Sequence, residues 1–459
     1  MVQYRRVWSF SVSRLQLQPM ARSLGRLLCL CLMPCLMVGH LLIYVVVSIF
    51  VFISYHPPEV PVLFVAPGTS SSSLKLAAHP LHPFWNLQLD SGALWNKLQH
   101  PLDRQYNPIL RGNDTDAMGR LTNPAKVQPQ VGVSTCRPDQ RWVTHLPDFD
   151  TLPDQMRDFV LSMHCTEYPL LLNEPGFCGE GGNEEGPMLL IAVKSQTANF
   201  ESRQAIRQTW GASGWVKGEA GGEGGLVRTV FLLGRQDGST GIYPELGELL
   251  EVESRQHHDI LQWDFRDTFF NLTLKDILFW RWLAANCPHA RFIFKGDDDV
   301  FLRTRSLLDY LYQQEEDARS RTINGTGGAW DFVVGDVIIN AAPNRQPSTK
   351  YYIPDSFYKG MYPAYAGGGG VVYSGELALR LKEVSERVYL FPIDDVYLGM
   401  CLHRLGISPT HHPGFMTFDL PEEARSKACA YHSVLLVHKR SPKEMLRLWS
   451  ELQRLPPPC

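Results

Sequence analysis

Short apolar runs alternate with amphipathic stretches over the C-terminal two thirds of the chain. The apolar runs are rich in β-branched and aromatic residues, which is typical of buried strands. The pattern predicts strands at residues 188–193, 227–233, 291–295 and 332–337, and helices at 202–210, 276–287 and 307–315. Such alternation is typical of an α/β fold with a mainly parallel central sheet. Ligands of such sheets bind at the carboxyl ends of the strands, so we expect the functional residues directly after the strands.

The N-terminal pattern is different. No charged side chain occurs between Leu27 and Pro58, a run longer than the roughly 20 residues that cross a bilayer core. Five arginines and no acidic residue precede this run. The positive-inside rule therefore predicts a type II protein with a cytosolic tail at 1–26 and a single transmembrane helix at 27–55. A cleaved signal peptide is the alternative, but no small-x-small cleavage site precedes Pro57.

Beyond this run, residues 56–135 are predicted to form a lumenal stem. The segment is rich in Pro, Ser, His, Gln and Asn and has little periodicity, so it cannot form much of a core. Trp85 and Trp95 are isolated aromatic residues that we expect to anchor short helices onto the folded domain. The catalytic domain is predicted to span residues 136–459.

Three sequons, at Asn113, Asn271 and Asn324, agree with entry of the chain into the secretory lumen, where they would carry glycans. Seven cysteines follow the apolar run, in a compartment that favours disulfides. Because seven is odd, at least one of them is a free thiol or joins another chain. The chain contains no CxxC pair, which argues against a structural zinc site. Its formal charge of −3 gives no electrostatic case for nucleic acid as a partner.

Three aspartates, Asp297, Asp298 and Asp299, follow the predicted strand at 291–295. Clustered carboxylates repel one another and are costly to bury unless a cation joins them. A hard divalent cation with oxygen ligands is the natural partner, and with open positions it can also hold a diphosphate. A solvated acidic turn is the simpler alternative. The spacing of an EF-hand is missing.

Two more clusters follow. Gly367, Gly368, Gly369 and Gly370 form a run that indicates either close approach of the backbone to a ligand or a loop that orders on binding, although a tight turn is the simpler reading. Neither a Rossmann nor a P-loop spacing is present. The adjacent pair Asp394 and Asp395 precedes an apolar segment. The pair either caps a helix, with Asp394 as the N-cap, or supplies a general base.

Taken together, the motifs resemble glycosyltransferase family 31, the β-1,3-glycosyltransferases of the Golgi. They are ESRQAIRQTWG (201–211), FLLGR (231–235), DILQWDFRDTFFNLTLK (259–275), KGDDDVFL (295–302), YPAYAGGGGVVYSG (362–375) and PIDDVYLGMCL (392–402). The resemblance covers residues 187–459. The tail CAYHSVLLVHKRSPKEMLRLWSEL looks most like the β-1,3-N-acetylglucosaminyltransferases that build poly-N-acetyllactosamine. Galactosyltransferase relatives more often carry Glu-Asp-Val where this chain has PIDDVY.

The resemblance implies a GT-A fold, a UDP-sugar donor, Mn²⁺ or another divalent cation, and inversion at the anomeric carbon. By position in its motifs, it implies that Asp297, Asp299 and His438 are metal ligands, with a core or surface role as the alternative for His438. Asp395 matches the catalytic base, and Asp394 positions it or touches the acceptor. The donor-binding residues are expected to be Arg203, Arg207, Lys295, Asp297, Asp298, Gly368 and Gly369.

The expected function is transfer of N-acetylglucosamine from UDP-GlcNAc, in β-1,3 linkage, to a galactose-terminated glycan on a glycoprotein or glycolipid. The expected location is the Golgi membrane, with the catalytic domain in the lumen. A β-1,3-galactosyltransferase that uses UDP-Gal is the alternative within the class. A non-catalytic glycan-binding protein and a glycosidase are the alternatives outside it, and intact acidic motifs argue against the first. The sequence leaves open a homo-oligomer or a hetero-oligomer with other glycosyltransferases.

Overall fold

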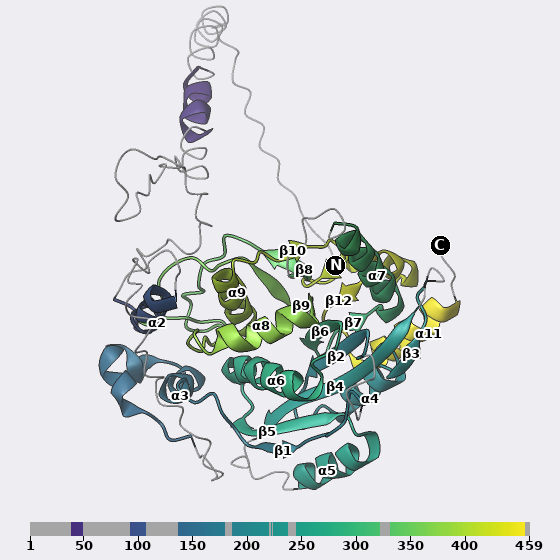
Figure 1. Ribbon diagram of the computed structural model, residues 1–459. Helices are drawn as coiled ribbons and strands as arrows, with labels where there is room; N and C mark the ends of the chain where they lie inside the picture. The colour runs from purple at the N-terminus through teal and green to yellow at the C-terminus, as the bar shows by residue number, and fades with distance from the viewer. Residues whose placement is uncertain are drawn as a thin grey trace, which may run out of the picture. The chain divides into compact units, whose positions relative to one another are not determined.

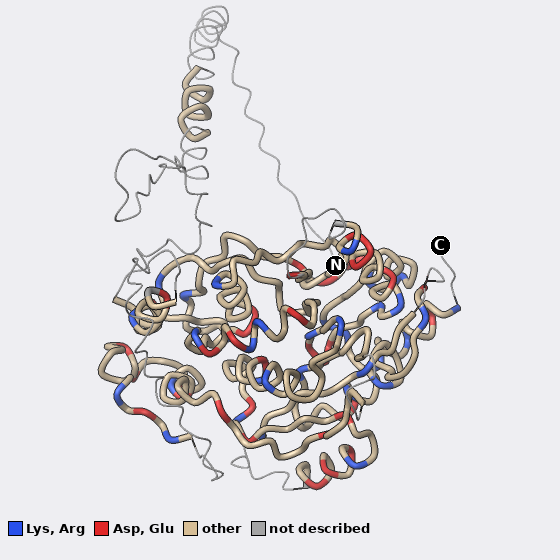
Figure 2. Tube along the Cα trace, in the orientation of Figure 1, with Lys and Arg blue, Asp and Glu red and all other residues tan. Residues whose placement is uncertain are grey.

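The computed structural model describes residues 38–48, 92–106, 136–179, 186–219, 222, 224–236, 245–321 and 331–454 (Figure 1). The chain divides into two compact units, Met1–Lys75 and Leu76–Cys459. The second unit contains all of the predicted catalytic domain. Basic and acidic residues are intermixed along the described chain, in agreement with the formal charge of −3 (Figure 2).

A central sheet organises the second unit. Its strands run in the order β1, β5, β4, β2, β6, β9, β8, β10, and β3 pairs with β4. Their bounds are β1 Leu170–Leu172, β2 Leu189–Lys194, β3 Gly214–Val216, β4 Gly225–Arg235, β5 Ile260–Arg266, β6 Phe292–Asp297, β8 Val333–Ile338, β9 Tyr365–Ser374 and β10 Thr410–His411. A second, small sheet consists of β11 (Phe415–Met416), β12 (Leu436–Val437) and β7 (Phe301–Leu302).

The sheet is mixed, so the expectation of a mainly parallel sheet is wrong. β5, β4, β2 and β6 form a parallel core, but β9 runs antiparallel to both β6 and β8, and β1 runs antiparallel to β5. The physical reason lies in the connection from β8 to β9. Residues 339–364 contain no helix, and a parallel neighbour would need a crossover, usually helical. The alternation of strands and helices therefore predicts only the first half of the sheet.

The expected transmembrane helix at 27–55 is also overturned. Among the residues that the structure describes, no helix is both long and apolar enough to cross a membrane. The described helical part of this segment is residues 38–48. The apolar composition of residues 27–55 predicted the span, and the other residues of this segment lie outside the described part of the chain.

Helices cover both faces of the central sheet (Figure 1). One core joins the sheet to α3 (Asp154–Ser162), α6 (Leu272–Asn286), α8 (Gly375–Ser385) and α9 (Asp394–Leu405). The other joins it to α4 (Phe200–Gln208), α5 (Glu245–His257), α7 (Thr304–Arg321), α11 (Pro442–Arg454) and the small sheet. Every residue of β2 is buried, as expected for a central strand between two layers. Short α10 (Glu422–Arg425) and η8 (Ala428–Ser433) precede β12.

Helix α2 (Leu94–Tyr106) belongs to this folded unit although it lies within the predicted stem. Trp95 is buried, and its indole Nε1 donates to the carbonyls of Tyr389 and Leu390, 3.2 Å away in each case. Arg404 of α9 forms an ion pair with Asp103 at the other end of α2. The prediction that Trp95 anchors a short helix is confirmed. Trp85 lies outside the described residues.

Two disulfides, Cys136–Cys165 and Cys178–Cys287, fasten the chain that precedes β2, and Cys429 is disulfide-bonded as well. Cys401 is a free and buried thiol of the described residues, which fits the odd count. Among the sequons, Asn113 and Asn324 lie outside the described residues. Asn271 precedes α6, and its amide nitrogen donates to the carbonyl of Arg266. Occupancy of the three sequons stays a prediction.

Candidate active site

The three aspartates that follow the β6 strand point to different partners. Asp297 is the last residue of β6. Asp298 turns toward the loop after β2, where its Oδ2 accepts hydrogen bonds from Ser195 Oγ at 2.6 Å and from Asn199 Nδ2 at 2.9 Å. Burial raises the pKa of Asp298, although these two donors oppose the shift. Asp298 therefore anchors the loop after β2, and Asp297 and Asp299 remain for a metal.

Asp297, Asp299 and His438 form a cluster whose ligand atoms all lie within 4.8 Å of one another. His438 Nε2 is 3.2 Å from Asp299 Oδ1 and 3.9 Å from Asp297 Oδ2. The small sheet brings His438 to this place. Because β12 runs antiparallel to β7, with Val437 opposite Phe301, the residue after β12 arrives beside the residues that precede β7.

A hydrogen bond at Nδ1 of the His438 ring leaves Nε2 available as a metal ligand. Nδ1 lies 3.0 Å from the carbonyl oxygen of Thr417. A carbonyl only accepts, so Nδ1 carries the hydrogen and the Nε2 atom faces the carboxylates. Two carboxylates and one imidazole are a donor set that suits Mn²⁺. The residues present therefore fit a divalent cation.

Charges within the cluster already act on one another. Burial works against ionisation of Asp299, but the hydrogen bond and the charge of His438 outweigh it and hold the pKa of Asp299 below its ordinary value. Burial likewise opposes protonation of His438, yet Asp299 and Asp297 raise the pKa of the imidazole. The two acids thus favour a positive charge at the end of β6, as a cation site requires.

The adjacent acids Asp394 and Asp395 open helix α9, with Ile393 as the N-cap residue, so neither acid caps the helix. Asp394 is buried, and its Oδ2 accepts from Lys194 Nζ at 2.5 Å. Burial opposes its ionisation, but the charges of Lys194 and Lys295 prevail and lower the pKa of Asp394. The carboxylate of Asp394 is therefore buried and already paired with Lys194.

The carboxylate of Asp395 accepts no hydrogen bond from the described part of the chain, and its side chain is half-buried. Burial, and after it the negative charge of Asp394, raise the pKa of Asp395. Asp297 contributes to the same shift, so the two carboxylates lie within electrostatic reach of each other. An unengaged carboxylate with a raised pKa beside a cation site is a candidate general base.

The glycine run accommodates both Asp395 and His438. Gly367–Gly370 lie within strand β9, not in a loop or a tight turn. A Cβ atom at Gly368 would lie 2.9 Å from Asp395 Oδ2, and one at Gly369 would lie 3.4 Å from His438 Cβ. Successive residues of a strand face opposite sides. The missing side chains thus let Asp395 approach one face of β9 and His438 the other.

Replacing Gly368 by Ala is expected to lower kcat by about 10- to 100-fold, because the new methyl group displaces the carboxylate of Asp395. The fold should survive, since the end of a side chain can move aside. Steady-state kinetics and thermal unfolding measure the two effects. Gly247→Ala on α5 is the matched control, because its Cβ meets nothing within 4 Å. A Gly368→Ala enzyme with the parental kcat would mean that the position of Asp395 is unimportant.

Arg203 and Arg207, which were predicted to bind the sugar donor, form ion pairs within the fold. Arg203 is fully buried and binds both oxygens of Glu253 as well as the carbonyls of Gln196 and Thr197. Arg207 forms ion pairs with Glu253 and Asp259. Arg203 thus supports the same loop that Asp298 anchors, one layer behind the site. Donor contact by these two arginines stays a prediction.

Lys295 is also placed beneath the site. Its side chain is 1% exposed, and its Nζ lies 2.5 Å from Asp276 Oδ2 on α6. Its predicted contact with a diphosphate is untested. Lys194, by contrast, reaches Asp297 Oδ1 at 2.9 Å and was missed by sequence reasoning. The signal was a single lysine that ends an otherwise apolar strand.

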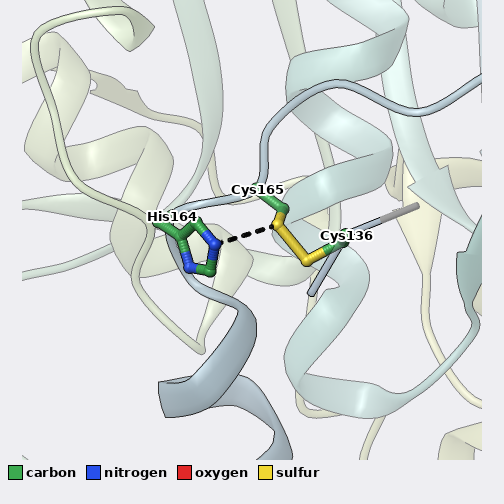
Figure 3. Close-up of side chains that lie close together, drawn as sticks. All are labelled: Cys136, His164 and Cys165. Carbon is green, nitrogen blue, oxygen red and sulfur yellow. Dashed lines mark hydrogen bonds between the residues drawn. A yellow bond between two sulfur atoms is a disulfide. The ribbon is translucent and has the colours of Figure 1, made fainter. Parts of the chain in front are cut away.

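A second group of possible metal ligands, Cys136, His164 and Cys165, lies far along the chain from these motifs. The two cysteines are joined in a disulfide, and His164 Nε2 lies 3.4 Å from Cys165 Sγ (Figure 3). Sulfur atoms bonded to each other are not thiolate ligands. In the oxidised protein, this group is a structural crosslink.

Comparison with known proteins agrees with the geometry. Residues 201–413 match the model of the Galactosyltransferase family. N-acetyllactosaminide beta-1,3-N-acetylglucosaminyltransferase 2 of Homo sapiens is 45% identical over 376 residues, which cover 82% of this chain and 88% of the relative. UDP-GlcNAc:betaGal beta-1,3-N-acetylglucosaminyltransferase 7 of Rattus norvegicus is 44% identical over 315 residues, which cover 67% of this chain and 73% of the relative.

A third relative, N-acetyllactosaminide beta-1,3-N-acetylglucosaminyltransferase 4 of Homo sapiens, is 44% identical over 303 residues, 65% of this chain and 72% of its own. These matches confirm the resemblance that the sequence motifs indicated. With this identity and coverage, the chain belongs to glycosyltransferase family 31 and is a β-1,3-glycosyltransferase.

Proposed function

We propose that the protein transfers N-acetylglucosamine from UDP-GlcNAc, in β-1,3 linkage, to a galactose-terminated glycan. The names of the similar proteins support this donor and this kind of acceptor, because they describe β-1,3-N-acetylglucosaminyltransferases that act on N-acetyllactosaminide or on βGal. Extension of poly-N-acetyllactosamine is the corresponding biological reaction. The acceptor is carried by a glycoprotein or a glycolipid.

The observation that carries the proposal is the difference in contacts between the two adjacent acids, Asp394 and Asp395. Asp394 is bound by Lys194 and buried, whereas Asp395 accepts no hydrogen bond from the described residues and lies against the bare face of Gly368. A general base must be free to meet the incoming hydroxyl. Asp395 meets this requirement and Asp394 does not.

The chemistry follows from this arrangement. Asp395 takes the proton of the galactose 3-hydroxyl while that oxygen bonds to the anomeric carbon of the donor. The bond from the anomeric carbon to the diphosphate breaks, and UDP leaves with the electron pair. With a single base and no covalent intermediate, this displacement inverts an α-linked donor to a β-linked product, by the logic of single-displacement glycosidases.

Asp297, Asp299 and His438 would hold Mn²⁺ or another divalent cation, which neutralises the leaving diphosphate when it is bound. Asp298 orients the loop after β2 through Ser195 and Asn199. The missing side chains of Gly368 and Gly369 leave room for the carboxylate of Asp395 and for His438, respectively.

We place the reaction in the lumen of the Golgi. Disulfides Cys136–Cys165 and Cys178–Cys287 support an oxidising compartment, in which such bonds form and persist. The sequons at Asn113, Asn271 and Asn324 are consistent with the same compartment.

The test uses the purified protein with an N-acetyllactosamine acceptor and either UDP-GlcNAc or UDP-Gal. We expect transfer from UDP-GlcNAc, loss of transfer with a chelator, recovery with Mn²⁺, and a β-1,3-linked product by NMR. UDP-Gal is the informative competitor, since the matching family model is named for galactosyl transfer. Transfer from UDP-Gal alone would overturn the donor, an α-linked product would overturn inversion, and activity in the chelator would overturn the metal.

A further inference from the structure

Lys194 connects two parts of the site that come from different elements. It ends β2, and its side chain is 4% exposed. Its Nζ lies 2.9 Å from Asp297 Oδ1, at the end of β6, and 2.5 Å from Asp394 Oδ2, at the start of α9. Asp297 belongs to the metal cluster, and Asp394 immediately precedes the base Asp395.

The sheet explains why one lysine reaches both acids. Lys194 and Asp297 are partners in the parallel pairing of β2 with β6, so their side chains leave the same face of the sheet. Helix α9 packs on this face, in the core that contains Val396 and Leu398 (Figure 1). The first turn of α9 thereby delivers Asp394 to the Lys194 ammonium.

A buried ion pair is by itself weak evidence for stability, because apolar residues of similar volume often stabilise a fold as well or better. The position of Lys194 next to a predicted metal ligand and one residue from the base therefore calls for a functional reason. Transfer needs the donor and the base at a fixed separation, and errors of about 1 Å can reduce rates about 100-fold.

We propose that Lys194 is a positioning residue that fixes the distance between the donor half of the site, at Asp297, and the base half, at Asp395. This inference rests on the proposed function and deepens it. Lys194 touches neither the reacting atoms nor the acceptor in this role. It acts through Asp297 on one side and through Asp394 and the first turn of α9 on the other.

The experiment compares Lys194→Met, Asp394→Asn and the double variant in the full chain. Lys194→Met leaves the buried carboxylate of Asp394 without its ammonium, and Asp394→Asn leaves Lys194 with Asp297 as its remaining acid, so both are expected to lower Tm, the first more than the second. The double variant removes both buried charges and should recover Tm. We expect kcat to fall about 100-fold in each single variant and to stay low in the double variant. KM for UDP-GlcNAc and for N-acetyllactosamine should change less than about 5-fold.

Two residues that act as a unit give non-additive losses. The double variant should therefore be no slower than the slower single variant. A double variant with parental Tm and parental kcat would show that the pair is only structural. Losses that multiply in the double variant would show that Lys194 and Asp394 act separately, and either result overturns the proposal.

The matched control is Arg404→Met/Asp103→Asn, which removes an ion pair at the opposite end of the same helix α9. We expect it to lower Tm and to leave kcat within about 2-fold of the parent, because it lies outside the site. Equal loss of kcat in this control would mean that any loosening of α9 slows transfer, and the specific role of Lys194 would be rejected.

Binding of Mn²⁺ alone, followed by electron paramagnetic resonance, gives a readout that does not depend on turnover. Lys194→Met removes a positive charge 2.9 Å from a ligand oxygen, so Mn²⁺ should bind at least as tightly as in the parent. If Mn²⁺ binding weakened in proportion to the loss of kcat, Lys194 would act only by supporting the metal ligand Asp297, and the positioning role would be rejected. If the parent used UDP-Gal, the proposed donor would be wrong, and the same variants would still test Lys194 with that donor.

Discussion

Replacing Asp395 by Asn is expected to lower kcat by about 10²- to 10⁴-fold, the usual scale for loss of a general base. Asn keeps the size of the side chain and some of its hydrogen bonding but cannot accept the proton of the acceptor hydroxyl. KM for UDP-GlcNAc should change little, because in the proposed arrangement the diphosphate binds the cation held by Asp297, Asp299 and His438, and Asp395 is not one of these ligands. Steady-state kinetics with both substrates varied measure this separation of kcat from KM.

The control for this prediction is Asp355→Asn, the same chemical change at an exposed acid that pairs with Arg345 on the surface. It should leave kcat and Tm unchanged, since exposed ion pairs contribute little. If the Asp395→Asn enzyme turned over within a few-fold of the parent, Asp395 would not be the base. Asp394 would then be the next candidate despite its contact with Lys194.

The pH dependence has a definite sign. Burial and Asp394 raise the pKa of Asp395, so kcat/KM of the parent should fall with decreasing pH already above the ordinary range of an aspartate, near 4. The carboxylate is lost as pH falls through its pKa, and the protonated acid cannot act as a base. The residual activity of Asp395→Asn should lack this acid limb.

Replacing Asp299 by Ala is expected to reduce transfer more than about 1,000-fold and to abolish tight binding of Mn²⁺. One of three clustered ligands is removed, and His438 loses the acid 3.2 Å from its Nε2. The fold should be preserved, because the side chain of Asp299 is half-exposed and the hydrogen bond from Arg440 N goes to its backbone carbonyl. Calorimetry with Mn²⁺, Tm and transfer assays measure the three effects.

Asp355→Ala is the control, since it deletes a carboxylate of the surface without touching the cluster. It should bind Mn²⁺ and transfer sugar like the parent. Normal turnover by Asp299→Ala, or a parent enzyme that works in excess chelator, would reject the metal site. A loss of Tm equal to that of a core variant would instead assign Asp299 to the fold.

Local patterns predicted the parts of the fold that depend on neighbouring residues. The apolar runs marked β2, β4, β6 and β8, and the amphipathic stretches marked α4, α6 and α7. They failed at β9, because a strand with four consecutive glycines carries no periodic signal and has little intrinsic strand preference. Antiparallel pairing of β9 with β6 and β8 supplies its stability, and such pairing depends on distant segments.

The same limit applies to the site. Asp297, Asp299 and Asp395 were predicted from clusters of acids, and His438 only through family resemblance. The bridge from Lys194 to Asp297 and Asp394 joins residues about 100 and 200 positions away, as the parallel pairing of β2 with β6 and the packing of α9 dictate. No spacing along the chain encodes this bridge. Arg203 and Lys295 were predicted to bind the donor, but in the fold their positive side chains pair with Glu253 and Asp276. Sequence motifs do not reveal such partners.

The sequence by itself determined the family, the α/β class and the acids of the site, because these follow from local composition and from motifs that remain recognisable in order. Only the tertiary structure decided which acid is free. Asp394 and Asp395 are neighbours with the same side chain, and they differ because one side chain turns to a buried ammonium and the other to a glycine face. Burial and electrostatic interaction depend on position in space, so the division of roles between two identical residues arises from packing.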